Sequence, residues 1–168
     1  MVAQTMVAQN VVFGILAAVM VIAAFRLVTT QNVVRAALFL AIVLAGVAGI
    51  YILLAAEFVA WVQVLVYIGA VVVLLLFGVM LTRAPIGRDA DLDNDQRVLG
   101  ALVALFLLGA LGAVLLDGFG DDKIGDFAIR RTAEVSDSIF GAYVVPFEVS
   151  SVLLLAALVG AVALARPD

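Results

Sequence analysis

The sequence places four groups capable of proton or hydrogen-bond chemistry in or beside long apolar runs: Glu57, Gln63, Tyr67 and Glu148. Glu57 immediately precedes one run and Glu148 lies in the first turns of another, where a helix dipole favours a carboxylate by about 0.3–1 kcal/mol. For Glu148 a role in an ion path and a role as an interfacial carboxylate remain equally open, whereas for Glu57 the interfacial role is favoured. Lysine and arginine lie only at or beyond the ends of the runs. Neither acid can therefore form a complete transmembrane relay alone.

Tyr67 is close to the midpoint of an apolar stretch that carries no charge from Phe58 to Leu81. In a helix it would lie about 14 Å from the start of that stretch, where its hydroxyl needs a partner within protein. The most common role of such a tyrosine is packing with a satisfied hydroxyl. Gln63, four residues earlier, is expected on the same helix face. The pair could organise water between helices or simply hydrogen-bond a neighbouring helix.

The residues after Tyr67 form a locally weak helix. Gly69 lowers helix propensity by about 1 kcal/mol relative to alanine, and three β-branched valines follow at 71–73. Such weak points can host a π-bulge, which is rare in general and concentrated at functional sites. A bulge here would rotate one half of the helix relative to the other.

Composition defines the class of protein. Hydrophobic residues make up 67% of the 168 residues and charged residues 13%, against about half and a quarter in soluble domains. This predicts an integral membrane protein without a nucleic-acid partner. The chain has no cysteine and no histidine, which removes the usual ligands of zinc, haem and iron–sulfur clusters. We therefore expect no bound metal or redox centre in this chain.

Uninterrupted apolar runs predict an all-α fold, a single membrane domain over residues 1–168 with five transmembrane helices. The predicted spans are approximately 11–27, 33–54, 58–81, 99–116 and 143–165. The N-terminus lacks the positive start of a secretory signal, so the first run is expected to be a retained span. Stripes of small residues, which permit close helix packing, recur at every fourth position of the second and fifth spans: Ala41, Ala45, Gly49, Ala157, Ala161 and Ala165.

Two longer loops separate the last three spans, at 83–98 and 117–142. The first has aspartate at every second position from Asp89 to Asp95. The start of a calcium-binding EF-hand loop looks similar, but the required glycine at the sixth position and glutamate at the twelfth are missing. A solvated acidic loop is the favoured interpretation.

The positive charges predict the orientation in the membrane. Six arginines fall on one side of a five-span topology and only three basic residues on the other. The positive-inside rule then places the C-terminus inside and the N-terminus outside. The two groups are Arg26, Arg35, Arg83, Arg88, Arg97 and Arg166 on the inner side, and Lys123, Arg130 and Arg131 on the outer side.

Three segments together resemble one known family. AEFVAWVQVLVYIGAVVVLLLFGVMLT, ending at Thr82, is similar to the third transmembrane helix of subunit J of bacterial NADH:quinone oxidoreductase (respiratory complex I), the counterpart of mitochondrial NADH dehydrogenase subunit 6. TQNVVRAALFL at 30–40 is similar to the opening of the family's second helix, and FGAYVVPFEVSSVLLLAALVGAVALAR at 140–166 to its last helix. Val33 stands where the family often has proline, although Asn32 can still cap this helix.

This resemblance implies a membrane-arm subunit of a proton-pumping NADH dehydrogenase in the bacterial inner (plasma) membrane, with no cofactor and no catalytic residue of its own. It implies that the other membrane-arm subunits are its partners, and that NADH, FMN, iron–sulfur clusters and quinone belong to the whole complex, so that this chain meets the quinone pool only indirectly. In the family, a π-bulge in the third helix gates a water path between quinone reduction and proton transfer. The matching positions here are Tyr67, Ile68, Gly69 and Ala70, and Glu148 matches a family position in the last helix. Glu57 and Gln63 receive no family role.

Two other classes of function remain open from the residues. A small self-contained transporter should show paired repeats and broken helices around a mid-membrane site, but five spans divide poorly into repeats. A subunit of a related cation/proton antiporter complex would use the same helices for gating or only for packing. Purification distinguishes these functions, because a complex subunit should co-purify with partners.

Overall fold

The computed structural model describes residues 2–82, 96–120 and 130–165, and these residues are entirely helical outside short turns. Five helices are long and apolar enough to cross a membrane, which confirms the predicted number of spans. They cover Val7–Thr29, Val33–Leu53, Glu57–Leu81, Arg97–Phe119 and Val144–Ala165. The acidic loop with Asp89–Asp95 lies outside the described residues, as do Arg83, Arg88, Lys123 and Arg166.

Helices α1 (Val2–Thr29) and α2 (Val33–Leu53) form an antiparallel hairpin. The turn between them is closed by Asn32, whose side-chain oxygen accepts a hydrogen bond from the Arg35 backbone N–H at 3.0 Å. The predicted cap of α2 is therefore confirmed, without a proline at Val33.

The third span is one continuous helix in three parts: α3 (Glu57–Val62), η1 (Gln63–Val72) and α4 (Val73–Leu81). It is joined to α2 by a tight turn in which Ala55 adopts a positive φ of 55°. The Ala56 N–H donates to the Tyr51 carbonyl and the Ala55 N–H to the Ile52 carbonyl, both at 2.9 Å. This pair of hydrogen bonds is a Schellman motif, which usually has glycine at the position of Ala55.

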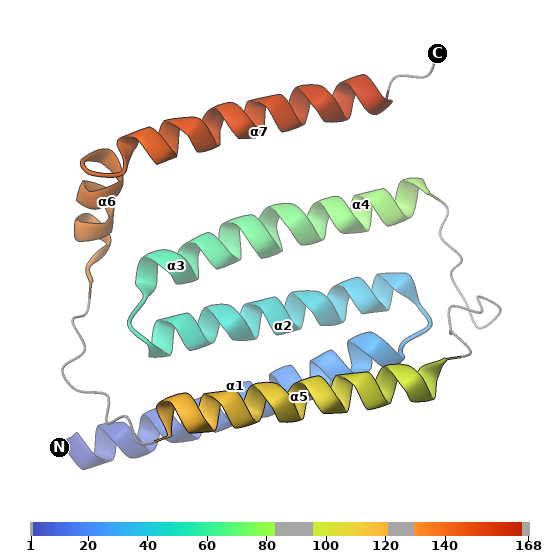
Figure 1. Ribbon diagram of the computed structural model, residues 1–168, viewed down its shortest axis with the longest axis vertical. Helices are drawn as coiled ribbons and strands as arrows, with labels where there is room; N and C mark the ends of the chain where they lie inside the picture. Colours follow the sequence, from blue (N-terminus) through green and yellow to red (C-terminus); the bar gives the residue numbers. More distant parts are fainter. Residues whose placement is uncertain (1, 83–95, 121–129, 166–168) are drawn as a thin grey trace.

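α2 lies between α1 and the third span (Figure 1), and outside η1 the buried residues of this layer are small. On α2 they are Ala37, Gly46 and Ala48, and Ala23 and Ala60 are buried on the neighbouring helices. Close packing through small residues is thus observed, as expected where lipid provides no drive for helix association. The predicted stripe is only partly right, because Ala45 is exposed.

The last two spans stand apart from this layer. Among the described helices, α5 (Arg97–Phe119) contacts no other, and α7 (Val144–Ala165) contacts only α6 (Thr132–Phe140). The predicted packing stripe at Ala157, Ala161 and Ala165 is consequently exposed and meets no helix of this chain within the described residues. α6 lies in the predicted 117–142 loop and touches α3. An exposed ion pair, 3.5 Å long, joins Arg130 just before α6 to Glu134 in the first turn of α6.

Candidate functional site

The centre of the third span is π-helical over ten residues, Gln63–Val72. Backbone angles at its borders are right-handed helical, with φ −59° and ψ −43° at Val62 and φ −64° and ψ −44° at Val73. The helix therefore passes from α to π and back to α without a break in the chain direction. The segment contains Tyr67, Ile68, Gly69 and Ala70, and π-helical geometry of this kind is rare and concentrated at functional sites.

The π-helix changes which side chains face α2. Gln63 and Val72 are both buried and Ile68 is half-buried between them. The separation of nine residues from Gln63 to Val72 thus covers two helical turns. This matches i→i+5 hydrogen bonding, at about 4.4 residues per turn. In a regular α-helix the positions one and two turns after Gln63 would be Tyr67 and Ala70. Instead Ile68 occupies the first of them, and Tyr67 remains 48% exposed.

Gln63 is the buried polar residue of the described chain, with only 8% of its surface exposed. Its side chain makes no hydrogen bond to the described residues. The polar atoms of the amide nevertheless keep some accessible surface. The amide therefore remains available to water or to another protein. Gln63 and Tyr67 do not share the buried face, contrary to the expectation from their spacing, because the π geometry turns Tyr67 aside.

The π form does not require glycine at position 69 on steric grounds. A Cβ atom built on it would lie 3.5 Å from the Val64 carbonyl oxygen, which is an ordinary van der Waals contact. No other atom outside its own helical turn comes within 4 Å. Gly69 itself is exposed.

The two acids do not join this site. Glu57 is the first residue of α3 and is exposed, and Glu148 is exposed in the first turns of α7, which does not contact η1. Neither forms an ion pair with the described residues. Within the same residues there is no group of three potential metal-ligating side chains. The candidate site is thus a π-helical segment within an otherwise α-helical span. It contains one buried amide and no charged group.

A bulge that rotates one half of the helix was expected from the sequence, but a change of face between Gln63 and Tyr67 was not. Its signal lies in the spacing of the buried and half-buried residues from 60 to 76 of this span, with a step of five from Gln63 to Ile68: Ala60, Gln63, Ile68, Val72 and Leu76. Because almost every residue of this span is apolar, the sequence has no polar face against which such a five-residue step would stand out.

Comparisons with known proteins place the whole chain. A family model described as NADH-ubiquinone/plastoquinone oxidoreductase chain 6 matches residues 23–164. The chain is 42% identical over 168 residues to F(420)H(2) dehydrogenase subunit J of Methanosarcina mazei, covering 95% of this chain and 92% of that protein. It is 39% identical over 166 residues to NAD(P)H-quinone oxidoreductase chain 6 of Synechocystis sp., covering 95% and 82%. A third relative, NAD(P)H-quinone oxidoreductase chain 6 of Leptolyngbya boryana, is 39% identical over 172 residues, covering 95% and 81%. The resemblance inferred from three segments is confirmed along nearly the full length, and the chain belongs to the family of NADH-ubiquinone/plastoquinone oxidoreductase chain 6.

Proposed function

We propose that this chain is a non-catalytic membrane-arm subunit of a proton-pumping NADH:quinone oxidoreductase, and that η1 gates the coupling of quinone reduction to proton translocation. NADH, FMN, iron–sulfur clusters and quinone would be bound by partner subunits. Family membership supports the assembly, and the ten-residue π-helix at the centre of the third span is the observation that carries the gate.

The gate works through the register of η1. If η1 relaxes to an α-helix while α3 stays fixed, Tyr67 takes the position beside α2 that Ile68 occupies in the π form. An apolar side chain is then replaced by a phenol, one turn from the buried amide of Gln63. Two polar groups on one face can hold ordered water, which needs two to four polar partners. The α form would therefore hold more ordered water beside α2 than the π form, in which Gln63 is the only polar side chain on that face among the described residues of the third span.

The chain controls such a path and does not itself supply protons to it. Every charged side chain of its described spans lies within five residues of a span end, and Glu57 and Glu148 lie at the same end of the bundle rather than at η1 (Figure 1). The titrating groups of the path would belong to partner subunits. Gly69 lowers the helix propensity of the segment, so the two helical forms can lie close in free energy.

The orientation is part of the proposal. Arg26, Arg35 and Arg97 lie at one end of the bundle, which is the end of the α1–α2 turn and of the start of α5 (Figure 1). We place this end on the inner side of a bacterial plasma membrane by the positive-inside rule, with the N-terminus outside and the C-terminus inside.

Purification of the native assembly through a tag on this chain tests the proposal, with cryo-EM maps of the resting and the turning-over enzyme. We expect the other subunits of the oxidoreductase to co-purify. We also expect η1 to have i→i+5 hydrogen bonds in one class and i→i+4 bonds, with Tyr67 beside α2, in another. A chain that purifies alone would indicate a transporter. An unchanged η1 in every class would indicate a packing subunit.

A further inference from the structure

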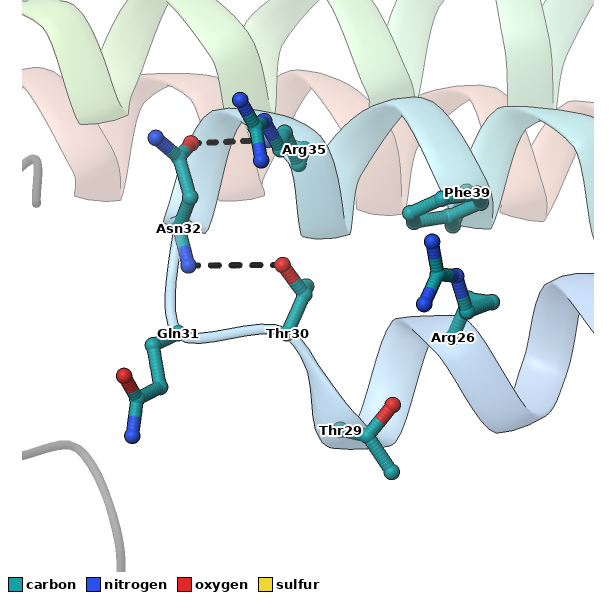
Figure 2. Close-up of a pocket in the computed structure, with 7 residues that line it drawn as sticks. All are labelled: Arg26, Thr29, Thr30, Gln31, Asn32, Arg35 and Phe39. Atoms are coloured by element: carbon teal, nitrogen blue, oxygen red, sulfur yellow. Dashed lines mark hydrogen bonds between the residues drawn. The ribbon is translucent and has the colours of Figure 1, made fainter. Parts of the chain in front are cut away.

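A cavity of about 780 Å³ lies at the turn between α1 and α2, away from η1 (Figure 2). This size is within the range of about 300–1,000 Å³ that is typical of small-molecule sites. Two arginines, four uncharged polar residues and one phenylalanine line it, and no acidic residue does among the described residues. The only charged side chains of this described lining are therefore the two arginines.

The two arginines approach the cavity from different helices. Arg26 is in the last turn of α1, and its guanidinium lies 5.9 Å from the centre of the Phe39 ring on α2. This cation–π contact links the two helices and restricts the arginine side chain. Arg35 is in the first turn of α2, where Asn32 binds its backbone N–H and leaves its guanidinium free (Figure 2). Neither guanidinium has an ion pair within the described residues.

The surroundings favour an anion at membrane depth. The turn connects two spans, so the cavity lies where hydrocarbon meets the headgroup region. The N-terminus of α2 borders it and adds the positive end of a helix dipole. Three apolar side chains next to the turn are exposed: Phe25, Val28 and Leu38. A ligand with a phosphate and hydrocarbon chains could bind both parts of this surface: the phosphate at the arginines and the chains along the apolar side chains.

We propose that this cavity binds the phosphate group of an anionic phospholipid. A guanidinium can bind phosphate oxygens through two parallel hydrogen bonds. Arg26 and Arg35 would hold the phosphate from two sides, while the acyl chains lie along the apolar flank of α1 and α2. Basic pockets between transmembrane helices bind anionic headgroups in this way. The site depends on the α1–α2 hairpin alone and is independent of the gate at η1.

Photo-crosslinking tests the site in the native assembly, reconstituted into vesicles of phosphatidylcholine and phosphatidylglycerol. The probes are phosphatidylglycerol and phosphatidylcholine carrying the same photoreactive acyl chain. We expect phosphatidylglycerol to label peptides of residues 25–39 preferentially. Each arginine should contribute roughly fivefold to that preference. The double variant Arg26→Gln/Arg35→Gln should therefore abolish it, and Arg26→Lys/Arg35→Lys should keep part of it.

The matched control is Arg130→Gln/Arg131→Gln, which removes two arginines from the opposite end of the bundle and should leave the preference unchanged. Equal labelling by the two lipids in wild type would overturn the proposal, as would a preference that survives in the Gln variant. Crosslinks from this segment to another subunit instead of lipid would assign the arginines to a protein interface. Loss of labelling at millimolar inorganic phosphate would assign the cavity to free phosphate. If the double Gln variant fails to assemble, each single variant should still lose roughly fivefold, and an unchanged preference in both would overturn the site.

Discussion

Replacement of Gly69 by leucine tests the gate most directly. In the π form an added Cβ makes only an ordinary contact among the described residues, 3.5 Å from the Val64 carbonyl oxygen, and the position is exposed. The expected defect therefore concerns the conversion to the α form and leaves folding of the observed form intact. Gly69→Leu should assemble normally and lose proton pumping.

The size of the effect follows from helix geometry. The α-helix turns about 100° per residue and the π-helix about 82°, so over the six residues from Gln63 to Gly69 the two forms differ by about 110°. A Cβ at Gly69 would therefore move by about 5 Å between the two forms. The movement crosses the face turned away from α2, where partner subunits are expected to pack. Overpacking typically costs about 1–3 kcal/mol, which shifts the balance of the two forms by roughly 5- to 150-fold.

The assay measures NADH:quinone reductase activity and the quenching of a pH-sensitive dye in the same inverted membrane vesicles. Pumping per quinone reduced should fall in Gly69→Leu and partly in Gly69→Ala. Gly78→Leu is the matched control, because Gly78 lies in the α-helical part of the same span and a Cβ added to it would meet no described atom within 4 Å. Normal pumping by an assembled Gly69→Leu complex would refute a gate at this position.

Three further substitutions have expected outcomes. Tyr67→Phe should reduce pumping only modestly, by about the 0.5–1.5 kcal/mol of one hydrogen bond, in the same vesicle assay; complete loss would assign the hydroxyl an essential proton-transfer role. Ala55→Gly should stabilise the α2–α3 turn by up to about 1 kcal/mol by relieving its positive φ, seen as later thermal release of this subunit from the assembly. Gly46→Ala should destabilise the packing of α1 against α2 by about 1–3 kcal/mol, because its Cβ would overlap the Met20 side chain. The subunit should then leave the assembly at a lower temperature. Gly14→Ala, with open space around its Cβ, should have no such effect, and equal stability of both variants would contradict the packing argument.

Much of the fold was predictable because the bilayer leaves few choices. An uncharged run of about 20 residues in the bilayer must form a helix to satisfy its backbone hydrogen bonds. Asparagine is also a preferred helix N-cap, so the role of Asn32 was predictable from its residue type. The weak helix around Gly69 was also visible from residue types. The packing of individual faces was not, because small residues are frequent on every face. Ala45 belongs to the predicted small-residue stripe and Gly46 does not, yet Gly46 is buried and Ala45 is exposed.

The candidate site was predictable in position but not in orientation. Gln63 and Tyr67 are four residues apart, a spacing that puts them on one face only if the helix between them is regular. The structure separates them because η1 inserts additional residues per turn. The cavity with Arg26 and Arg35 was missed for another reason. The two arginines belong to different helices, and only the turn at 30–32 brings those helices together.

The isolation of α5 and α7 has a consequence for how the cell makes this protein. Each span is long and apolar enough to enter the bilayer on its own, but the chain supplies no neighbours in the described helices that would retain α5 in one place. A newly made copy without its partners would therefore have α5 without packing contacts to the described helices, and α7 attached to them only through α6. Such an orphan copy is an expected substrate for membrane quality-control proteases, so the cellular level of this subunit should follow the supply of its partners.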